Sequence, residues 1–553
     1  MRCFLLKTLS FCLLSCLTAL GDSALEGNRP WLRWHFAGTK AIKANKEAPT
    51  VNEIWRLPES KRLANVLVDR LSQAPERQIF GANASAPTVR RRIIKEIVQG
   101  LFTYESIGEF NGNPSEHPNL TIGIKLPLAK LDNWDRNIRR YLGTLGWKAP
   151  EENPDNDNLD WTAAHENPAL LARLIKQADW LLFSIGPDAF SQLPEWNANI
   201  TNNQPPTLKG KAALEIDGDL ESLTQWLGSI SVPSLPSFSA TFKPEETSVR
   251  TEATFHLKQE IQTPLPDWQP PTEHIFEPIV SFSGARGLNH LIESLPVSEK
   301  LVREGIPEQF FSWSRPAIIS TNSIPLFPMY LGWPIPNDHI SIADLTKRMP
   351  LIAGPGIMQS GSARLVSFPD RNESIIQILP SFIQPFVRGA TNKTHGARIV
   401  GLFPLSKSPN PAPSALFDQL NSKENMVYYQ WEITQRRIET YKTLIRFLSF
   451  LFQKPQGEPR GVGFQWLTAI ESKMGNAVTI VTAPETKKLE LVRKSHFGLT
   501  GLELTAIARW IEASSFPWID TELLSTWDMR SFLPPTTAPA APGLPKKNVK
   551  TRR

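Results

Sequence analysis

The sequence predicts an α+β protein with two related lobes, each a largely antiparallel sheet with helices on one face. Three observations indicate this. At 553 residues the chain exceeds what one hydrophobic core usually supports. Segments that alternate apolar and polar residues outnumber the buried Val/Ile runs that a parallel sheet needs. A short motif also occurs twice, which indicates a possible internal duplication.

The repeated motif is an aromatic residue, a small residue, Gly and an apolar closure, followed by a Leu-Pro pair that opens a helix. One copy lies at 36–42 with Leu57 and Pro58 after it, and the other lies at 282–288 with Leu295 and Pro296 after it. Their connections differ in length, which loops tolerate at little cost. We interpret the motif as a strand-to-helix unit, one in each lobe.

The expected organisation has four parts. These are a signal peptide (1–21), an N-terminal α+β lobe (22–240), a C-terminal α+β lobe (241–533) and a disordered Pro-rich basic tail (534–553). A Pro- and Ser-rich stretch at 232–236 marks the expected boundary between the lobes.

Local patterns predict the elements of the first lobe in order. Aromatic alternation predicts a strand over 31–42, and Pro58 fits a first helical turn. Isoleucines at helical spacing predict a helix over 90–108. Asp219 is a candidate helix cap. Further strands are predicted at 120–126, 180–185 and 212–217. One further helix is predicted to begin at Pro127, and another is predicted over 168–177.

The second lobe is predicted in the same way. Strands are expected at 249–257, 397–403 and 426–431, and the Pro- and Gly-rich stretch 307–385 suggests a sheet with irregular connections. Thr434 is a candidate cap for a helix that reaches about Phe452. Thr500 and Glu503 form a capping-box pattern before a final helix.

Charge and cysteine content exclude several functions. The net charge is +6, but residues 1–21 carry +2 and the last eight residues carry +5, which leaves 22–545 at −1. A nearly neutral body argues against nucleic-acid binding. All three cysteines lie within the first sixteen residues, so the body has no disulfide, thiolate nucleophile or cysteine metal site.

The first 21 residues predict export. Basic residues precede an apolar run from Leu9 to Leu20, which is too short to span a bilayer, and no later segment supplies a transmembrane span. Cleavage after Gly21 would give a periplasmic or extracellular product. The alternative is a lipobox at 13–16, which would leave a lipoprotein anchored at Cys16.

Local motifs predict no cofactor, metal or catalytic residue. The Gly-rich stretch 354–362 lacks the Lys of a phosphate-binding loop, and the acidic stretch 155–160 departs from a calcium loop at its fifth and sixth positions. His35 and His496 are interpreted as structural. No nucleophile elbow supports Ser283 or Ser362 as a nucleophile.

Two polar-aromatic stretches, 428–434 and 491–498, supply the candidate site. We expect Arg286, Glu432, Arg493 and His496 to meet in one polar cluster. Such a cluster would either serve a function or form buried ion pairs that orient the sheet and helices.

The runs 276–287, 429–434 and 493–496 resemble uncharacterised secreted proteins of verrucomicrobial-type bacteria. The resemblance covers most of the mature chain, and it implies that the protein belongs to the bacterial cell envelope. It implies no activity, cofactor or site residue.

These features predict a non-enzymatic protein of the bacterial cell envelope, a two-lobed binding or scaffold module of unknown ligand. Its basic tail is a candidate contact for an anionic envelope polymer or lipid. One alternative is a carrier that holds an apolar ligand between the lobes. A second alternative is a hydrolase whose site is assembled from residues distant in sequence.

Overall fold

The structure is a computed structural model, and it describes much of the chain between residues 30 and 516. The expected signal peptide with Cys16, the stretches 155–159 and 354–362, the second Leu-Pro pair and the tail 534–553 lie outside the described residues. The described ranges are 30–74, 88–114, 118–148, 160–166, 169–187, 193–226, 235–289, 307–319, 325–336, 342–343, 346, 363–378, 384–391, 395–401, 403, 410–452, 461–513 and 516.

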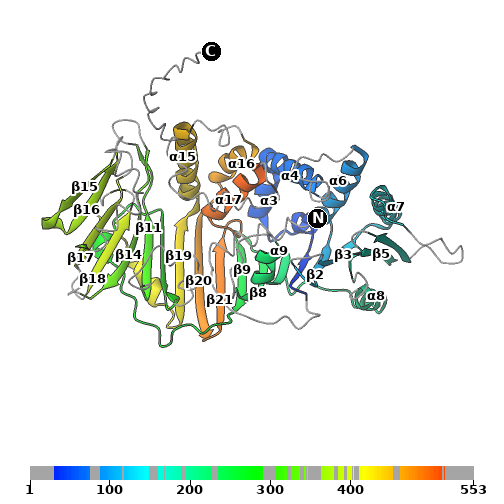
Figure 1. Ribbon diagram of the computed structural model, residues 1–553, viewed down its shortest axis with the longest axis horizontal. Coiled ribbons are helices and arrows are strands. Elements are labelled where there is room, and N and C mark those ends of the chain that lie inside the picture. Colours follow the sequence, from blue (N-terminus) through cyan, green and yellow to red (C-terminus); the bar gives the residue numbers. More distant parts are fainter. Residues whose placement is uncertain are drawn as a thin grey trace, which may run out of the picture.

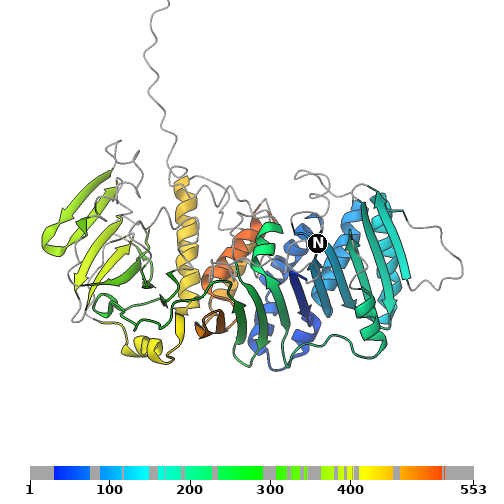
Figure 2. The same ribbon diagram turned by 60° about the horizontal axis from the view of Figure 1, so that its bottom comes forward.

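One continuous antiparallel sheet of 19 strands runs through the described part of both halves of the chain (Figure 1). The pairings give the order β4-β5-β6-β3-β2-β1-β7-β8-β9-β21-β20-β19-β10-β11-β14-β18-β17-β16-β15. Figure 2 shows the blue and cyan strands of the N-terminal half at one end and the yellow-green strands of the C-terminal half at the other.

The strands of the N-terminal half have the following bounds: β1 Leu32–Phe36, β2 Ser106–Asn111, β3 Asn119–Lys125, β4 Asp160–Glu166, β5 Ala169–Gln177, β6 Trp180–Gly186, β7 Leu214–Asp219, β8 Ser237–Pro244 and β9 Val249–His256. Those of the C-terminal half are β10 Ser281–Arg286, β11 Gln309–Ser314, β14 Met329–Ile335, β15 Ala363–Phe368, β16 Glu373–Ile378, β17 Phe386–Thr391, β18 Gly396–Gly401, β19 Met426–Ile433, β20 Asn476–Glu485 and β21 Lys488–Ser495. A separate hairpin consists of β12 Ile318–Ile319 and β13 Pro325–Leu326.

The strand order on the two sides of the β9–β21 pair follows one scheme. β1 lies between β2 and β7, as β10 lies between β11 and β19. Beyond β2 come β3, β6, β5 and β4, and beyond β11 come β14, β18, β17 and β16. On the other side β7 leads through β8 to β9, and β19 leads through β20 to β21. β15 extends the C-terminal half by one strand.

Most helices cover one face of the sheet, which we call the helix face; the other is the far face. Side chains of α4, α6, α7, α16 and α17 share a core with Ile124, Leu174 and Leu181 of the helix face. The helices are α2 Thr39–Ala44, α3 Pro49–Arg56, α4 Pro58–Leu71, α6 Thr88–Thr103, α7 Leu128–Thr144, α8 Leu193–Thr201, α9 Leu220–Trp226, α14 Ser414–Asp418, α15 Thr434–Phe452, α16 Val462–Glu471 and α17 Gly501–Glu512, with 3₁₀ turns at Thr272–His274, Pro369–Arg371 and Gln419–Asn421.

The far face is packed at both ends of the sheet. In the N-terminal half, α8 packs its Trp196 and Ile200 against Ile107 and Leu182. In the C-terminal half, α14 packs against an aromatic core that includes Phe282 of β10. The expectation of helices on one face therefore describes most helices, while α8 and α14 lie on the opposite side.

The helix predicted over 168–177 is wrong, because these residues form β5 between β4 and β6. The sequence of β5 is rich in Ala, Leu, Arg, Lys and Gln, which favour helices in isolation. Its Leu171, Leu174 and Ile175 are also spaced as on one helical face. Hydrogen bonding to a strand on each side overrides this local preference.

The helix predicted over 90–108 is too long. It ends at Thr103, and β2 begins at Ser106. Every residue of β2 is buried, since the strand lies between β1 and β3 and is covered on both faces. A strand buried on both faces lacks the alternation that marks strands in a sequence.

The two copies of the repeated motif occupy different positions in their strands. Phe36 ends β1, and Gly38 follows the strand with φ +82°. Phe282 is the second residue of β10, and Gly284 lies inside that strand. A left-handed glycine, Gly287 with φ +68°, follows β10 instead. The expected boundary at residue 240 falls within β8, which pairs on both sides.

Candidate functional site

Arg286 does not join the predicted polar cluster. Ser281 of β10 pairs with Glu432 of β19, so Arg286, five residues further along β10, lies about 17 Å away. Its guanidinium donates hydrogen bonds to the carbonyl oxygens of Met426 (2.8 Å), Pro266 (2.6 Å) and Glu424 (2.6 Å). Arg286 therefore ties the other end of the β10–β19 pair to the segment that precedes β10.

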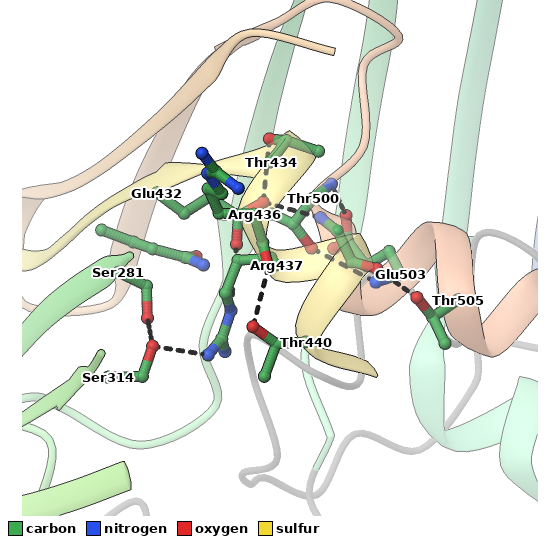
Figure 3. A network of polar contacts seen from close by, with 12 residues as sticks. Ser281, Ser314, Glu432, Thr434, Arg436, Arg437, Thr440, Thr500, Glu503 and Thr505 are labelled. Atoms are coloured by element: carbon green, nitrogen blue, oxygen red, sulfur yellow. Dashed lines mark hydrogen bonds and ion pairs between the residues drawn. The ribbon is translucent and has the colours of Figure 1, made fainter. Parts of the chain in front are cut away.

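The structure brings Glu432, Arg493 and His496 together where β19, β20 and β21 meet the starts of α15 and α17. Figure 3 shows Glu432, Arg437 and Glu503 in this region. We call this region the strand-end cluster and define it as Glu432, Arg437, Arg493, His496 and Glu503. Glu432 and Glu503 are 0 and 1% exposed, and Arg493 is 4% exposed. The cluster lies on the helix face of the sheet, beneath the helices.

Glu432 connects β19 to the first turn of α17. Its Oε1 accepts hydrogen bonds from the backbone N–H of Gly501 (2.6 Å) and from Thr434 Oγ1 (3.0 Å). Its Oε2 lies 3.7 Å from Nε of Arg437 on α15. A carboxylate at the first turn of a helix satisfies a free N–H and interacts favourably with the helix dipole.

Arg493 and Glu503 form a buried ion pair between β21 and α17. The Arg493 Nη1 donates to both carboxylate oxygens, at 3.0 and 2.8 Å, and its Nε donates to Thr479 Oγ1 at 2.9 Å. Glu503 also closes the capping box of α17, because its Oε2 accepts from the Thr500 N–H at 2.7 Å and Thr500 Oγ1 accepts from the Glu503 N–H at 3.3 Å. One carboxylate thus caps the helix and attaches it to the sheet.

His496 joins the cluster through the backbone. Its Nδ1 accepts a hydrogen bond from the Gly475 N–H (3.2 Å), and the Gly475 carbonyl accepts one from the Thr434 N–H (3.0 Å). A Cβ added at Gly475 would lie 2.1 Å from Cε1 of the imidazole, so only glycine fits this approach. Burial lowers the pKa of His496, which favours the neutral ring that this contact requires.

The sequence analysis did not identify the hydrogen bonds that link Arg437 of the strand-end cluster to two serines. Arg437 Nη1 donates to Ser314 Oγ at 2.9 Å, and Ser314 Oγ lies 2.8 Å from Ser281 Oγ (Figure 3). The serines lie on β10 and β11 and have no motif around them. Glu503 was visible as part of a capping box, but its pairing with Arg493 depends on how α17 packs on β21.

Burial raises the pKa of Glu432, and the nearby charge of Glu503 raises it further, while Arg437 and the hydrogen bonds from Gly501 and Thr434 oppose the shift. The described contacts of Glu432 are all with strands and helix starts. Arg493 likewise binds Glu503 and Thr479, and Glu503 also binds the backbone N–H of Thr500, the N-cap of α17. The geometry therefore suits a brace that fixes α15 and α17 on the sheet.

Glu432→Gln is expected to change how stability depends on pH. The folded state keeps the Glu432 proton at pH values where the unfolded chain, with a pKa near 4.5, has lost it. The stability from this proton is fully present below pH 4.5 and is lost as the pH rises through the raised pKa. The free energy of unfolding of the variant, measured by urea denaturation, should therefore rise relative to wild type from pH 4.5 to 8. Parallel profiles for the two proteins would contradict the shift.

Of the remaining sequence candidates, His35 and Ser283 lie among the described residues, and Ser362 lies outside them. His35 Nε2 lies 2.9 Å from Glu105 Oε1, as part of the β1–β2 region. Within the described ranges no three His, Cys, Asp or Glu side chains gather as a metal site. The helices in those ranges include none whose length and apolar character suffice to cross a membrane.

No family model and no curated protein matches the chain. Two solved structures are similar to part of it, crystal forms III and I of TP0453. The similarity covers 43% and 42% of this chain and 80% and 76% of the TP0453 chains, with TM-scores of 0.23 and 0.21 and identities of 11% and 12%. At these values the likeness transfers no site, ligand or activity.

Proposed function

We propose that the protein is an exported, non-enzymatic binding or scaffold module of the bacterial envelope, built from two related lobes. The observation that carries this proposal is the strand order, which follows the same scheme on the two sides of the β9–β21 pair. Duplication of a half-length unit accounts for such an arrangement. The two lobes then divide between β9 and β10, at 257–280, and join edge to edge through the β9–β21 pair into one continuous sheet.

The burial and the contacts of the strand-end cluster favour a structural module over an enzyme. A catalytic acid, base or nucleophile needs an atom that can reach a substrate. Glu432 and Glu503 are instead buried, and each binds the start of a helix. The Arg493 guanidinium donates hydrogen bonds to Glu503 and Thr479.

The basic tail is the proposed contact for an anionic partner. Lys546, Lys547, Lys550, Arg552 and Arg553 place five positive charges in the last eight residues, beside a body that is nearly neutral. Each such charge contributes about 1 kcal/mol near an anionic surface. Anionic lipid and anionic wall polymer both offer this chemistry.

Co-sedimentation tests this partner. The protein with and without residues 534–553 is mixed with vesicles of anionic lipid, with vesicles of neutral lipid, and with purified wall polymer. We expect the intact protein to sediment with one anionic partner, and we expect truncation or 0.5 M salt to release it, because salt screens exposed charges. Equal sedimentation of the two proteins would refute the role of the tail.

An activity screen separates the proposal from a concealed hydrolase. The wild-type protein and a His496→Ala variant are incubated with panels of ester, peptide and glycoside substrates. The proposed module shows no turnover with either protein. Hydrolysis that the wild type performs and the variant loses would overturn the non-enzymatic proposal and place a site at the strand-end cluster.

A further inference from the structure

Buried oxygen-bearing side chains gather on the far face of β2, β3 and β6. Glu109 of β2 pairs in register with Thr121 of β3, and Thr121 pairs with Ser184 of β6. One step along the same face, Asn111 pairs with Asn119. These five residues, which we call the oxygen lattice, are 0, 2, 0, 5 and 9% exposed in the order given. None of them was a sequence candidate.

Two oxygens of the lattice lack a hydrogen-bond donor among the described residues. Glu109 Oε2 accepts from Arg33 Nε (3.3 Å) and Nη2 (3.2 Å), but Glu109 Oε1 is buried and no residue in the described ranges donates to it. Asn111 Oδ1 is also buried, and the described part of the chain supplies no donor to it. Glu109 and Asn111 are alternate residues of one strand, so their side chains leave the same face about 7 Å apart. Buried acceptors left unsatisfied are costly, and a bound group that supplies positive charge removes the cost.

The neighbouring positions add more oxygen atoms. Thr121 Oγ1 and Ser184 Oγ lie 3.0 Å apart and share one hydrogen bond, which leaves lone pairs on both. The Asn119 amide lies over Gly186, where an added Cβ would come within 2.3 Å of Asn119 Oδ1. The absence of a side chain at Gly186 therefore leaves room for the Asn119 amide next to Asn111.

The C-terminal half fills the corresponding part of its sheet with aromatic side chains. β11 and β14 hold the places in the pairing order that β2 and β3 hold in the N-terminal half. Their far-face residues Phe311, Trp313 and Tyr330 are 0, 1 and 3% exposed and belong to one apolar core. The strand arrangement therefore accepts apolar packing here, and a buried carboxylate is no requirement of the sheet.

We propose that the oxygen lattice binds a hard cation, with Ca²⁺ as the reference ion, through Glu109 Oε1 and Asn111 Oδ1. Hard cations take oxygen ligands from carboxylates, amides and hydroxyls, which is the donor set present. Arg33, whose side chain is 54% exposed, orients the carboxylate by holding its other oxygen. With a single carboxylate the site is weak, with a Kd of roughly 10⁻⁴–10⁻³ M, the range of extracellular calcium modules.

Calorimetric titration of EDTA-treated, desalted protein with CaCl₂ tests the proposal directly. We expect saturable binding to about one site per chain with a Kd in the stated range. The midpoint of thermal unfolding should rise by roughly 1–3 °C in 10 mM CaCl₂ compared with NaCl of equal ionic strength. The absence of saturable heat in the wild-type protein, or an equal rise in NaCl, would overturn the proposal.

Variants assign the ion to the lattice. Glu109→Gln and Asn111→Leu should each weaken Ca²⁺ binding at least tenfold and abolish the thermal shift. Glu432→Gln alters a buried carboxyl of the C-terminal half and should leave both responses intact. Circular dichroism establishes that each variant is folded. Unchanged Ca²⁺ binding in folded Glu109→Gln would place the ion elsewhere and refute this site.

Discussion

Arg493→Met lowers the free energy of unfolding by about 3–5 kcal/mol, the cost of leaving one partner of a buried ion pair uncompensated. The substitution removes both hydrogen bonds from Arg493 to Glu503. It leaves the Glu503 carboxylate, which is 1% exposed, without its cationic partner. That carboxylate also caps α17, so the loss reaches the attachment of the helix to the sheet. Denaturation in urea, monitored by circular dichroism and Trp fluorescence, measures the change.

The exposed ion pair of Arg436 and Glu439 supplies the matched control. Their atoms lie 2.8 Å apart, as in the buried pair, but their side chains are 55% and 50% exposed. Arg436→Met should therefore cost at most about 1 kcal/mol, because solvent screens an exposed pair. Similar losses in the two variants would show that burial of the Arg493–Glu503 pair does not determine its contribution.

Phe282→Ala is expected to lower the free energy of unfolding by about 3–5 kcal/mol, since it leaves a cavity in a core that cannot collapse around it. Phe282 is 0% exposed. Its ring packs against Phe417 at 5.6 Å, Phe311 at 6.2 Å and Tyr429 at 6.4 Å between centroids. The removed ring therefore loses contacts with β11, β19 and α14 at once.

Phe36→Ala is the matched comparison from the other copy of the motif. Phe36 ends β1 and is only partly buried, at the margin of its core. Its loss should cost less than half as much as that of Phe282, because a partly exposed ring gives up less buried area. The urea midpoints of the two variants measure the difference. Equal costs would contradict the unequal positions that the structure assigns to the two phenylalanines.

Features set by neighbouring residues could be predicted from the sequence. α4 begins at Pro58, and α17 begins directly after its N-cap Thr500, with Glu503 closing the capping box from inside the first turn, as the local patterns indicate. The alternation of 249–257 predicts β9, whose side chains alternate between buried and more exposed positions. In each case the stabilising contacts lie within a few residues of one another, so the sequence order contains them.

The candidate site shows where local patterns stop being informative. Glu432, Arg493 and His496 were selected from two polar-aromatic stretches, and the structure gathers them at one end of the sheet. Arg286 was selected with them and lies at the other end of β10. Strand register decides which residues become neighbours, and register depends on pairing between segments far apart in the chain.

The sequence by itself determined the α+β class, the prevalence of amphipathic strands and the helix starts with their own caps. Only the tertiary structure decided that one sheet passes through both halves, that 169–177 is a strand, and that buried oxygens gather around Glu109. The physical reason is the same in all three. Each depends on hydrogen bonds or burial supplied by a distant strand, and such partners outweigh intrinsic preferences without leaving a local pattern.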